Sequence, residues 1–465
     1  MKYKFVGGGL LNKHNSPNLQ KFKENNIKRK VIVTAIIISI LLLSGVYLYS
    51  SFAVFSEEKN FNVINGKVSD PGDIYFAYYV DGEITHSIPR QNTGYTLNTE
   101  KSTCTNGVIP AWDNASWKFI GDYSGYNATD YARTRCNLYF EKTSKVVSTA
   151  IGNIEANTYT PDFSKSACDD STCESHEKGI YETQDDDGTS YYYRGSVENN
   201  YVKFAGFYWR IIRINGNGSI RMIYDGTSAH DNGEASEDRE YGTSLFSPGH
   251  NDNMYVGYMY SSGNAHGLGT SSIIKTSNDN FYTSKIAGYS SYIDTSSGFC
   301  GDRSSYNVMP GVGTGTVLTY YKTYTRLNRA TPSLKCNDSS DYYTTSSAST
   351  GNKALTYPVG LITLDEIVIA GSGAGYYDRA NFYTPQNKNG YLTTGTDFWT
   401  LSPSGYFNLF GFPSILAAIF SIGRDGIISD TYPPSGQGLR PVINLKNALK
   451  FTGDGTKNNP YIPSL

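Results

Sequence analysis

A long uncharged hydrophobic stretch lies near the N-terminus of the chain, at residues 31–56. An α-helix needs about 20 apolar residues to cross the hydrocarbon core of a membrane, and residues 31–50 supply that length. Eight Lys or Arg residues but a single acidic residue, Glu24, precede this stretch, and two acidic residues follow it. The positive-inside rule therefore predicts one transmembrane helix at 31–50, a cytoplasmic basic tail at 1–30, and an extracellular remainder anchored in the cell membrane.

A cleaved signal peptide is the alternative interpretation of this stretch. A signal peptide has a short basic segment and a cleavage site of small residues. Here the basic segment is 30 residues long, and the weak cleavage candidate lies at Ser51–Ala53. The pattern therefore favours an uncleaved anchor.

A small β-rich, sandwich-like domain is predicted at 67–145, after a spacer at 51–66. The segment IYFAYYVDGEI has the composition of β-strands and contains the turn pair Asp81-Gly82, which predicts a hairpin. A further strand is expected in CNLYF, which begins at Cys136. A disulfide would help a domain of this size to fold, because its hydrophobic core is small.

The composition of the chain changes twice between residues 146 and 350. Residues 146–195 are polar, acidic and poor in aliphatic side chains, and we interpret them as an acidic linker. After them, two apolar segments flank the Asn-Gly-Asn-Gly sequence at 215–218, which predicts a second hairpin. Residues 226–350 are rich in Gly, Ser, Asn and Tyr with little periodicity, which is typical of surface loops on a rigid scaffold.

The C-terminal part combines one helix pattern with strand patterns. The segment LITLDEIVIAGSG at 361–373 has apolar residues at helical spacing and a glycine as stop signal. FWTLSPSG at 398–405 and GLRPVINLK at 438–446 predict strands, and residues 451–465 are expected to be a tail. The chain as a whole is predicted to be α+β and mostly β.

Composition and charge exclude several classes of protein. Charged residues make up 18% of the chain, below the roughly 25% of average proteins, so a coiled coil is not expected. Aromatic residues reach 14%, which a disordered chain lacks. The formal net charge of −2 argues against a nucleic-acid partner, because nucleic-acid binders are usually strongly basic.

The six cysteines all lie on the predicted extracellular side, at Cys104, Cys136, Cys168, Cys173, Cys300 and Cys336. An even number of exported cysteines is typical of disulfides. The simplest of the fifteen pairings is sequential: Cys104 with Cys136, Cys168 with Cys173, and Cys300 with Cys336. Zinc is disfavoured because no CxxC or HxxxH pair exists, and a reactive pair at Cys168 and Cys173 is a weaker alternative.

Four short motifs follow one another along the chain: Trp209-Arg210, Asp365-Glu366, Trp399 to Pro403, and Arg440-Pro441-Val442. With these motifs the chain resembles a large group of uncharacterised exported Firmicute and Mollicute proteins. Those proteins carry a C-type-lectin-like domain of unknown function, in the superfamily that includes the formylglycine-generating enzymes. In the resembling domains a Trp-Arg strand opens the fold and an Arg-Pro strand closes it. The resemblance implies a C-type-lectin-like domain at 196–450.

The chain departs from the best-known activities of that superfamily. Formylglycine-generating enzymes use a reactive cysteine pair near the end of the fold, and no cysteine follows Cys336. The Glu-Pro-Asn, Gln-Pro-Asp and Trp-Asn-Asp triplets of calcium-dependent lectins are also absent. We therefore assign no catalytic, cofactor-binding or metal-binding residue. Calcium at Asp185-Asp186-Asp187 is a weak alternative to a solvated turn, because the spacing of an EF-hand is missing.

The residues of the four motifs are interpreted as structural. Trp209, Trp399, Arg210 and Arg440 could line a ligand surface, but large aromatic residues and buried arginines are more often part of a core. We expect carbonyl groups to satisfy the two arginines.

The remaining candidate residues give only weak indications of a catalytic or metal-binding role. Asp365 and Glu366 are adjacent on a predicted helix, so their side chains point about 100° apart and do not form an acid–base pair. We expect helix solvation or a local salt bridge. His230, His250 and His266 have no metal-ligand spacing and are expected in solvated loops.

The expected function is ligand binding at the bacterial cell surface, without catalysis. Tyr, Ser, Gly and Asn in residues 226–350 are the composition of adaptable binding surfaces, and the ligand is expected to be a glycan or a protein. One alternative is an oxidase of the formylglycine-generating type. Another is a purely structural component of the cell envelope.

Overall fold

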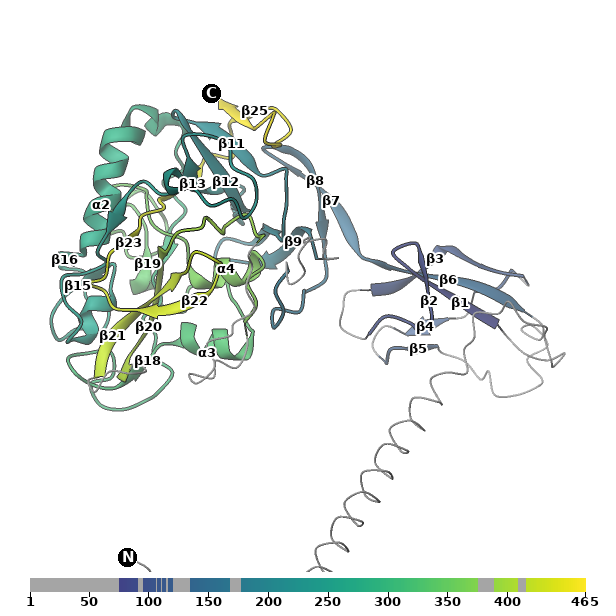
Figure 1. Cartoon of the computed structure of the whole chain (residues 1–465), viewed down its shortest axis with the longest axis horizontal. Coiled ribbons are helices and arrows are strands. Elements are labelled where there is room, and N and C mark those ends of the chain that lie inside the picture. The colour runs from purple at the N-terminus through teal and green to yellow at the C-terminus, as the bar shows by residue number, and fades with distance from the viewer. Residues whose placement is uncertain are drawn as a thin grey trace, which may run out of the picture. The chain divides into compact units, whose positions relative to one another are not determined.

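The computed structural model describes residues 75–90, 95–105, 107–109, 111–113, 116–119, 134–167, 177–374, 389–408 and 415–465. The predicted basic tail, transmembrane helix and spacer lie outside these residues. Within these ranges no helix is long and apolar enough to cross a membrane. The contacts divide the chain into an N-terminal unit (1–88, 98–111 and 119–139) and a C-terminal unit (89–97, 112–118 and 140–465), both drawn in Figure 1.

A four-stranded sheet with the order β2-β1-β6-β3 forms the N-terminal region. Its strands are β1 (Tyr75–Val80), β2 (Glu83–Thr85), β3 (Tyr95–Cys104) and β6 (Arg135–Lys142). Asp81 and Gly82 join β1 to β2 with positive φ angles of 50° and 88°, so the predicted hairpin is confirmed. The described residues here add only a two-stranded ribbon, β4 (Trp112–Asp113) with β5 (Lys118–Phe119), and not the second full sheet of a sandwich.

The larger sheet of the C-terminal unit has the order β24-β13-β12-β10-β9-β8-β7, with β11 paired to β12. Its strands are β7 (Ser144–Thr149), β8 (Gly152–Asn157), β9 (Gly179–Gln184), β10 (Thr189–Arg194), β11 (Tyr201–Phe204), β12 (Phe207–Ile214), β13 (Ile220–Gly226) and β24 (Val442–Leu445). The hairpin predicted around 215–218 is confirmed, since β12 and β13 pair antiparallel.

The predicted acidic linker at 146–195 is wrong, because β7 to β10 belong to this sheet. In these strands, buried residues such as Ile154, Tyr181 and Tyr192 are interspersed with polar ones. The polar residues lower the mean hydropathy and hide a strand pattern that has one buried face. The continuous main segment of the C-terminal unit therefore begins at residue 140, not at 196.

A second sheet of six strands has the order β14-β23-β20-β21-β22, with β18 paired to β20. Its strands are β14 (Thr243–Ser244), β18 (Thr319–Tyr320), β20 (Phe398–Asn408), β21 (Ile415–Ile422), β22 (Ile428–Thr431) and β23 (Gln437–Gly438). The strand predicted at 398–405 is confirmed as the start of β20, which is buried along almost its whole length. The predicted helix is α4 (Leu364–Ile369), and it contacts both β10 and β20.

The loop-rich region 226–350 holds two helices that its composition did not predict, α2 (Ile273–Phe281) and α3 (Lys322–Arg329). Figure 1 shows α2 along one side of the C-terminal unit, where Phe281 packs against Trp209 and Tyr224. The other elements of the region are short: 3₁₀ turns at Glu237–Arg239, Asn253–Val256, Ala287–Tyr292 and Ser339–Asp341, a π-helix at Tyr282–Ile286, and the strands β15 (Met259–Tyr260), β16 (Thr270–Ser271), β17 (Phe299–Cys300) and β19 (Tyr342–Tyr343).

The predicted C-terminal tail at 451–465 is wrong as well. β25 (Lys450–Thr452) pairs with β26 (Ile462–Ser464). The backbone of Tyr461 donates to Tyr201 O at 2.9 Å and accepts from Lys203 N at 2.9 Å. Local sequence does not reveal this docking, because it depends on backbone groups of β11 that lie far away in the chain.

The motif residues Trp209, Trp399, Arg210 and Arg440 are fully buried, as predicted. The indole nitrogens donate to backbone carbonyls, with Trp209 bonded to Phe204 O at 3.1 Å. Arg440 donates to two carbonyl oxygens and Arg210 to one. These four residues therefore hold the interior together and do not form a ligand surface.

Two of the three predicted disulfides are present, Cys104–Cys136 and Cys300–Cys336. They link residues 32 and 36 positions apart in the chain. The third predicted pair, Cys168 and Cys173, lies outside the described residues.

Candidate functional site

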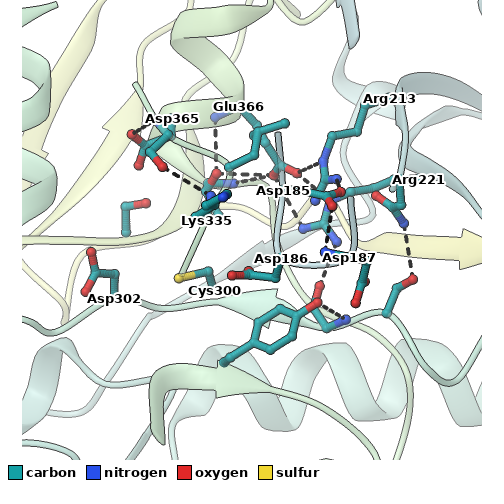
Figure 2. Close-up of a pocket in the computed structure, with 18 of the residues that line it drawn as sticks. Asp185, Asp186, Asp187, Arg213, Arg221, Cys300, Asp302, Lys335, Asp365 and Glu366 are labelled. Atoms are coloured by element: carbon teal, nitrogen blue, oxygen red, sulfur yellow. Dashed lines mark hydrogen bonds and ion pairs between the residues drawn. The ribbon is translucent and has the colours of Figure 1, made fainter. Parts of the chain in front are cut away.

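A narrow pocket lies in the C-terminal unit, and the space within it that is open to the centre of a water molecule is about 20 Å³. One wall comes from the larger sheet: the β9–β10 turn at 185–187 and side chains of β12 and β13. The other wall comes from residues 297–302, helix α3, residues 333–335 and β19. Helix α4 contributes Asp365 and Glu366 to the lining (Figure 2). The loop-rich region thus forms half of the lining.

Arg213 belongs to the pocket wall that comes from the larger sheet. Its Nη1 atom lies 2.6 Å from Asp185 Oδ2, and its Nε atom lies 3.0 Å from Glu366 Oε1. Figure 2 shows Arg213 joined to both carboxylates by dashed lines. All three side chains are at least nine-tenths buried. Asp185 also accepts from Gly216 N at 2.9 Å, so the carboxylate ties the β9–β10 turn to the β12–β13 turn.

Glu366 is shared by two arginines. Arg221 Nε lies 2.5 Å from Glu366 Oε1, and Arg221 Nη1 donates to Gly298 O at 3.1 Å. Glu366 also accepts from Thr363 N at 2.9 Å, which completes the capping box at the start of α4. Burial by itself raises the pKa of Glu366, but the charges of Arg221 and Arg213 outweigh this effect and hold the pKa below its ordinary value.

A second set of ion pairs lies beside the first. Arg326 of α3 makes a bidentate pair with Asp365, at 2.8 Å for each bond, and a third bond of 2.8 Å to Asp302. Asp365 Oδ1 accepts from Ser333 N at 3.0 Å as well. Burial lowers the pKa of Arg326, but the two carboxylates outweigh it and raise the pKa above its ordinary value. Both sets together are called the pocket-wall network: Arg213, Arg221, Arg326, Asp185, Asp302, Asp365 and Glu366.

The mouth of the pocket carries charges that are not part of this network. Asp186 accepts from Cys336 N at 3.0 Å, and both Asp186 and Asp187 are exposed. Partial loss of hydration raises the pKa of Asp186. The same effect, followed by the negative charges of Asp185 and Asp186, raises the pKa of Asp187. Lys335 is exposed on the same rim.

Neutral polar groups complete the lining. The Tyr342 hydroxyl accepts from Gly298 N at 3.0 Å, and burial raises the pKa of Tyr342 to about 12. Asn215 is 3% exposed and donates through Nδ2 to Ser219 and Asn444. Its Oδ1 atom has no hydrogen-bond partner. Asn444 Nδ2, on the other amide of this pair, has no hydrogen-bond partner either.

The structure corrects the expectation for Asp365 and Glu366. Neither side chain is solvated: they are 5% and 1% exposed, and each pairs with arginines far away in the chain. Both nevertheless line the same pocket. The 100° between neighbouring helix positions directs Glu366 to arginines of the sheet wall and Asp365 to Arg326 of the opposite wall, a convergence on one pocket that helix geometry alone did not predict.

The three histidines are not brought together at the pocket. His230 is buried, contrary to the prediction of a solvated loop, with its ring nitrogens 3.0 Å from Glu234 and 2.7 Å from Asp238. His266 pairs with Asp341 at 2.9 Å, and the hydrogen bond that its ring donates to the Asp341 carboxylate raises the pKa of His266. In the described ranges no three His, Cys, Asp or Glu residues are grouped so that they could hold a metal ion.

Sequence reasoning missed the arginines of the pocket wall. Arg213 and Arg221 occur in strands that consist mostly of apolar residues, and this is the signal that could have identified them. A charged residue on the buried face of a strand must have a partner there, because burial of an unpaired charge is costly. The partner, Glu366, lies 153 residues after Arg213 and has no local sequence signal.

No protein-family model, no curated protein and no solved structure matches the chain.

Proposed function

We propose that the protein is a ligand-binding protein of the bacterial cell surface and that its ligand binds in the pocket between the larger sheet and the loop-rich region. The observation that carries this proposal is the lining itself. Residues 297–302 and 333–335 of the loop-rich region face turns of the sheet across one cavity. Binding sites are commonly formed where variable loops meet a rigid scaffold.

The pocket-wall network supports binding because it is already ordered without a ligand. The buried ion pairs join the β9–β10 turn, β12, β13, α3 and α4. A wall that does not have to be ordered on binding costs less entropy when the ligand arrives. The disulfide Cys300–Cys336 adds a covalent link at the rim.

The same network favours binding over acid–base catalysis. A general acid or base must be able to exchange a proton with its substrate. Glu366 and Asp365 are instead held by arginines, and Asp302 is held by Arg326. These carboxylates position the wall, and they do not act as proton donors.

The proposal includes the C-type-lectin-like fold and the membrane anchor. The first three motifs lie in β12, α4 and β20, and the last one leads into β24, in the order of the resembling domains. Strand β24 pairs with β13 in the larger sheet. The two disulfides are typical of an oxidising, extracytoplasmic compartment. The uncharged stretch at 31–50 is the proposed anchor.

A binding screen with a matched pair of variants tests the role of the pocket. The full-length chain in detergent is applied to glycan and peptide arrays, together with Asp187→Arg at the mouth and Glu198→Arg in the loop that follows β10. We expect selective binding that Asp187→Arg abolishes and Glu198→Arg preserves. Absence of any selective binding, or binding that Asp187→Arg leaves intact, would contradict the proposal.

A further inference from the structure

We propose that the loop at residues 305–319 docks on a membrane surface whose lipid headgroups are negatively charged. This inference is independent of the pocket and gives the protein a second interaction surface. It is carried by three observations: exposed apolar side chains gathered on one loop, a buried side chain that holds the loop in place, and exposed cations beside it.

Exposed apolar side chains of the C-terminal unit are concentrated in the 305–319 loop. Of the ten large apolar residues that are exposed in the described part of this unit, four belong to the loop: Tyr306, Val308, Met309 and Leu318. Single exposed apolar residues are common on protein surfaces, whereas a group of them marks an interaction site. Val308 is 97% exposed, so its side chain adds no stability to the fold by burial.

The loop is a compact excursion of the chain that leads into β18. Its two limbs lie side by side, because Tyr306 N donates to Tyr320 O at 2.7 Å and Asn307 Nδ2 donates to Leu318 O at 2.9 Å. Figure 1 shows β18 with β20 and β21 at one end of the C-terminal unit. The apolar side chains are therefore presented together at that end.

A buried asparagine fixes the loop to the body of the unit. Asn253 is 1% exposed, and its Nδ2 atom donates to Val317 O at 2.7 Å and to Gly315 O at 3.0 Å. Its Oδ1 atom accepts from the Tyr321 hydroxyl at 3.1 Å. The loop is thus ordered before a partner arrives, which lowers the entropy cost of docking.

Positive charge borders the loop. Residues 303–337 contain five Lys or Arg residues and no acidic residue. Lys322 and Arg329 are exposed, and neither makes an ion pair within 4.0 Å in the described part of the chain. The guanidinium of Arg329 lies 5.8 Å from the centre of the Tyr306 ring, and Lys322 N donates to Ser304 O at 2.8 Å. Both cations therefore lie next to the exposed apolar side chains.

Two nearby carboxylates do not cancel this charge. Asp302 is buried and pairs with Arg326. Asp252 precedes the supporting asparagine, and its Oδ1 atom accepts from Met254 N at 2.8 Å as the cap of the turn at Asn253–Val256. One unpaired acid against two exposed cations leaves an excess of positive charge beside the loop.

An anionic membrane matches this combination of groups. Apolar and aromatic side chains enter the boundary between headgroups and acyl chains, while Lys and Arg attract anionic headgroups. Tyr306 has an apolar ring and a polar hydroxyl, as residues at a membrane interface do. A second copy of the chain fits less well, because docking through the same loop would bring like charges together. Four side chains are also few for a stable protein interface, which takes roughly 20–30 residues on each side.

The test places the full-length chain in lipid nanodiscs and measures whether the loop reaches the lipid. None of the four native tryptophans lies in the uncharged stretch at 31–56, and the emission of the unsubstituted chain is subtracted. Val308→Trp is compared with Val146→Trp, a valine of β7 that is 73% exposed and pairs with Glu155. The discs contain phosphatidylglycerol or phosphatidylcholine, each with and without bromine on the acyl chains, which quenches a tryptophan close to it.

We expect brominated phosphatidylglycerol to quench the emission of Val308→Trp and to leave that of Val146→Trp unchanged. Quenching should be weaker in phosphatidylcholine, which has no net charge. High salt should reduce quenching in phosphatidylglycerol, because it screens the attraction between the cations and the headgroups.

Charge variants in the Val308→Trp background locate the effect. Lys322→Gln and Arg329→Gln should each shift the docking equilibrium about five-fold away from the membrane, the effect of one cation near an anionic surface. Lys450→Gln removes an exposed cation of β25, which Figure 1 shows at the other end of the unit. This control should leave the equilibrium unchanged.

Three results would overturn the inference. The first is an unquenched Val308→Trp in brominated phosphatidylglycerol. The second is equal quenching in both lipids that neither Lys322→Gln nor Arg329→Gln changes, since docking would then not recognise anionic headgroups. The third is a blue-shifted but unquenched emission that grows with the number of chains per disc, which would identify a second copy of the chain as the partner of the loop.

Discussion

The C-terminal unit contains two clusters of buried arginines, and the positive charges of the two clusters are compensated by different partners. The core arginine cluster consists of Arg210, Arg239, Arg440 and Asp225, all of them fully buried. Two of its three cations, Arg239 and Arg440, pair with this single carboxylate, and backbone carbonyls provide most of the other contacts of the cluster. The pocket-wall network instead gives its three arginines four carboxylates. One cluster therefore has an excess of cations, and the other has an excess of anions.

The difference shows what each cluster stabilises. Arg239 donates to Tyr391 O at 3.0 Å and Thr393 O at 2.8 Å, and Arg440 donates to Leu392 O at 2.8 Å. The core cluster thus fixes the path of the backbone around residues 391–393. The pocket-wall network joins side chains of separate elements around a space that stays open. Carbonyl partners hold a chain segment in place, whereas carboxylate partners form a charged wall.

Loss of Asp225, the single anion of the core arginine cluster, should have the largest effect on the free energy of unfolding. Asp225 Oδ1 lies 2.9 Å from Arg239 and 3.0 Å from Arg440, and burial already lowers the pKa of Arg440 to about 10. We expect Asp225→Asn to lower the free energy of unfolding by about 3–5 kcal/mol, because two buried cations lose their counter-charge. Urea unfolding followed by near-UV circular dichroism measures the change. A loss below about 1 kcal/mol would mean that the carbonyls alone suffice.

Removal of one charge from the pocket-wall network should lower the free energy of unfolding less than Asp225→Asn does. Glu366→Gln keeps the shape of the side chain and leaves Arg213 paired with Asp185, so we expect a loss of about 2–3 kcal/mol, the value of charged hydrogen bonds. The same unfolding experiment measures it, with Glu198→Gln as an exposed control that should change nothing. If Glu366→Gln costs more than Asp225→Asn, the ranking of the two clusters is reversed.

The substitution with the smallest expected effect, Asp187→Asn, should increase the stability of the fold. The folded-state pKa of Asp187 is raised, so its ionised form disfavours the folded state at neutral pH. This cost is fully present above the folded pKa and disappears as the pH falls below the unfolded value of about 3.9. We expect Asp187→Asn to raise the melting temperature slightly at pH 7 and to have no effect near pH 3. A lower melting temperature at pH 7 would mean that Asp187 stabilises the fold.

Several local elements could be predicted because their signals are local. Asp81-Gly82 supplies the two positive φ angles that a tight hairpin needs. The Asn-Gly turn after β12, the capped helix α4 and the buried strand β20 have equally direct patterns. The burial of Trp209 and Trp399 follows from their size and apolar surface.

The predictions from the sequence were wrong where strands pair with segments that are distant in the chain. Strands β7 to β10 were interpreted as a linker because their solvent-facing residues are polar, and only their partners in the sheet identify them as strands. Residues 451–465 were interpreted as a tail for the same reason. Helices α2 and α3 are short, and neighbouring elements bury their inward faces.

The sequence by itself determined the mostly β character, the hairpin turns, the short helix and the residues of the two disulfides, because each depends on neighbouring residues or on composition. Only the tertiary structure decided that Asp185, Arg213, Arg326 and Glu366 surround one pocket. They come from four separate elements, and Arg213 and Glu366 lie 153 positions apart. The energy of a buried charge depends on the partner that folding brings to it, and no local pattern contains that partner.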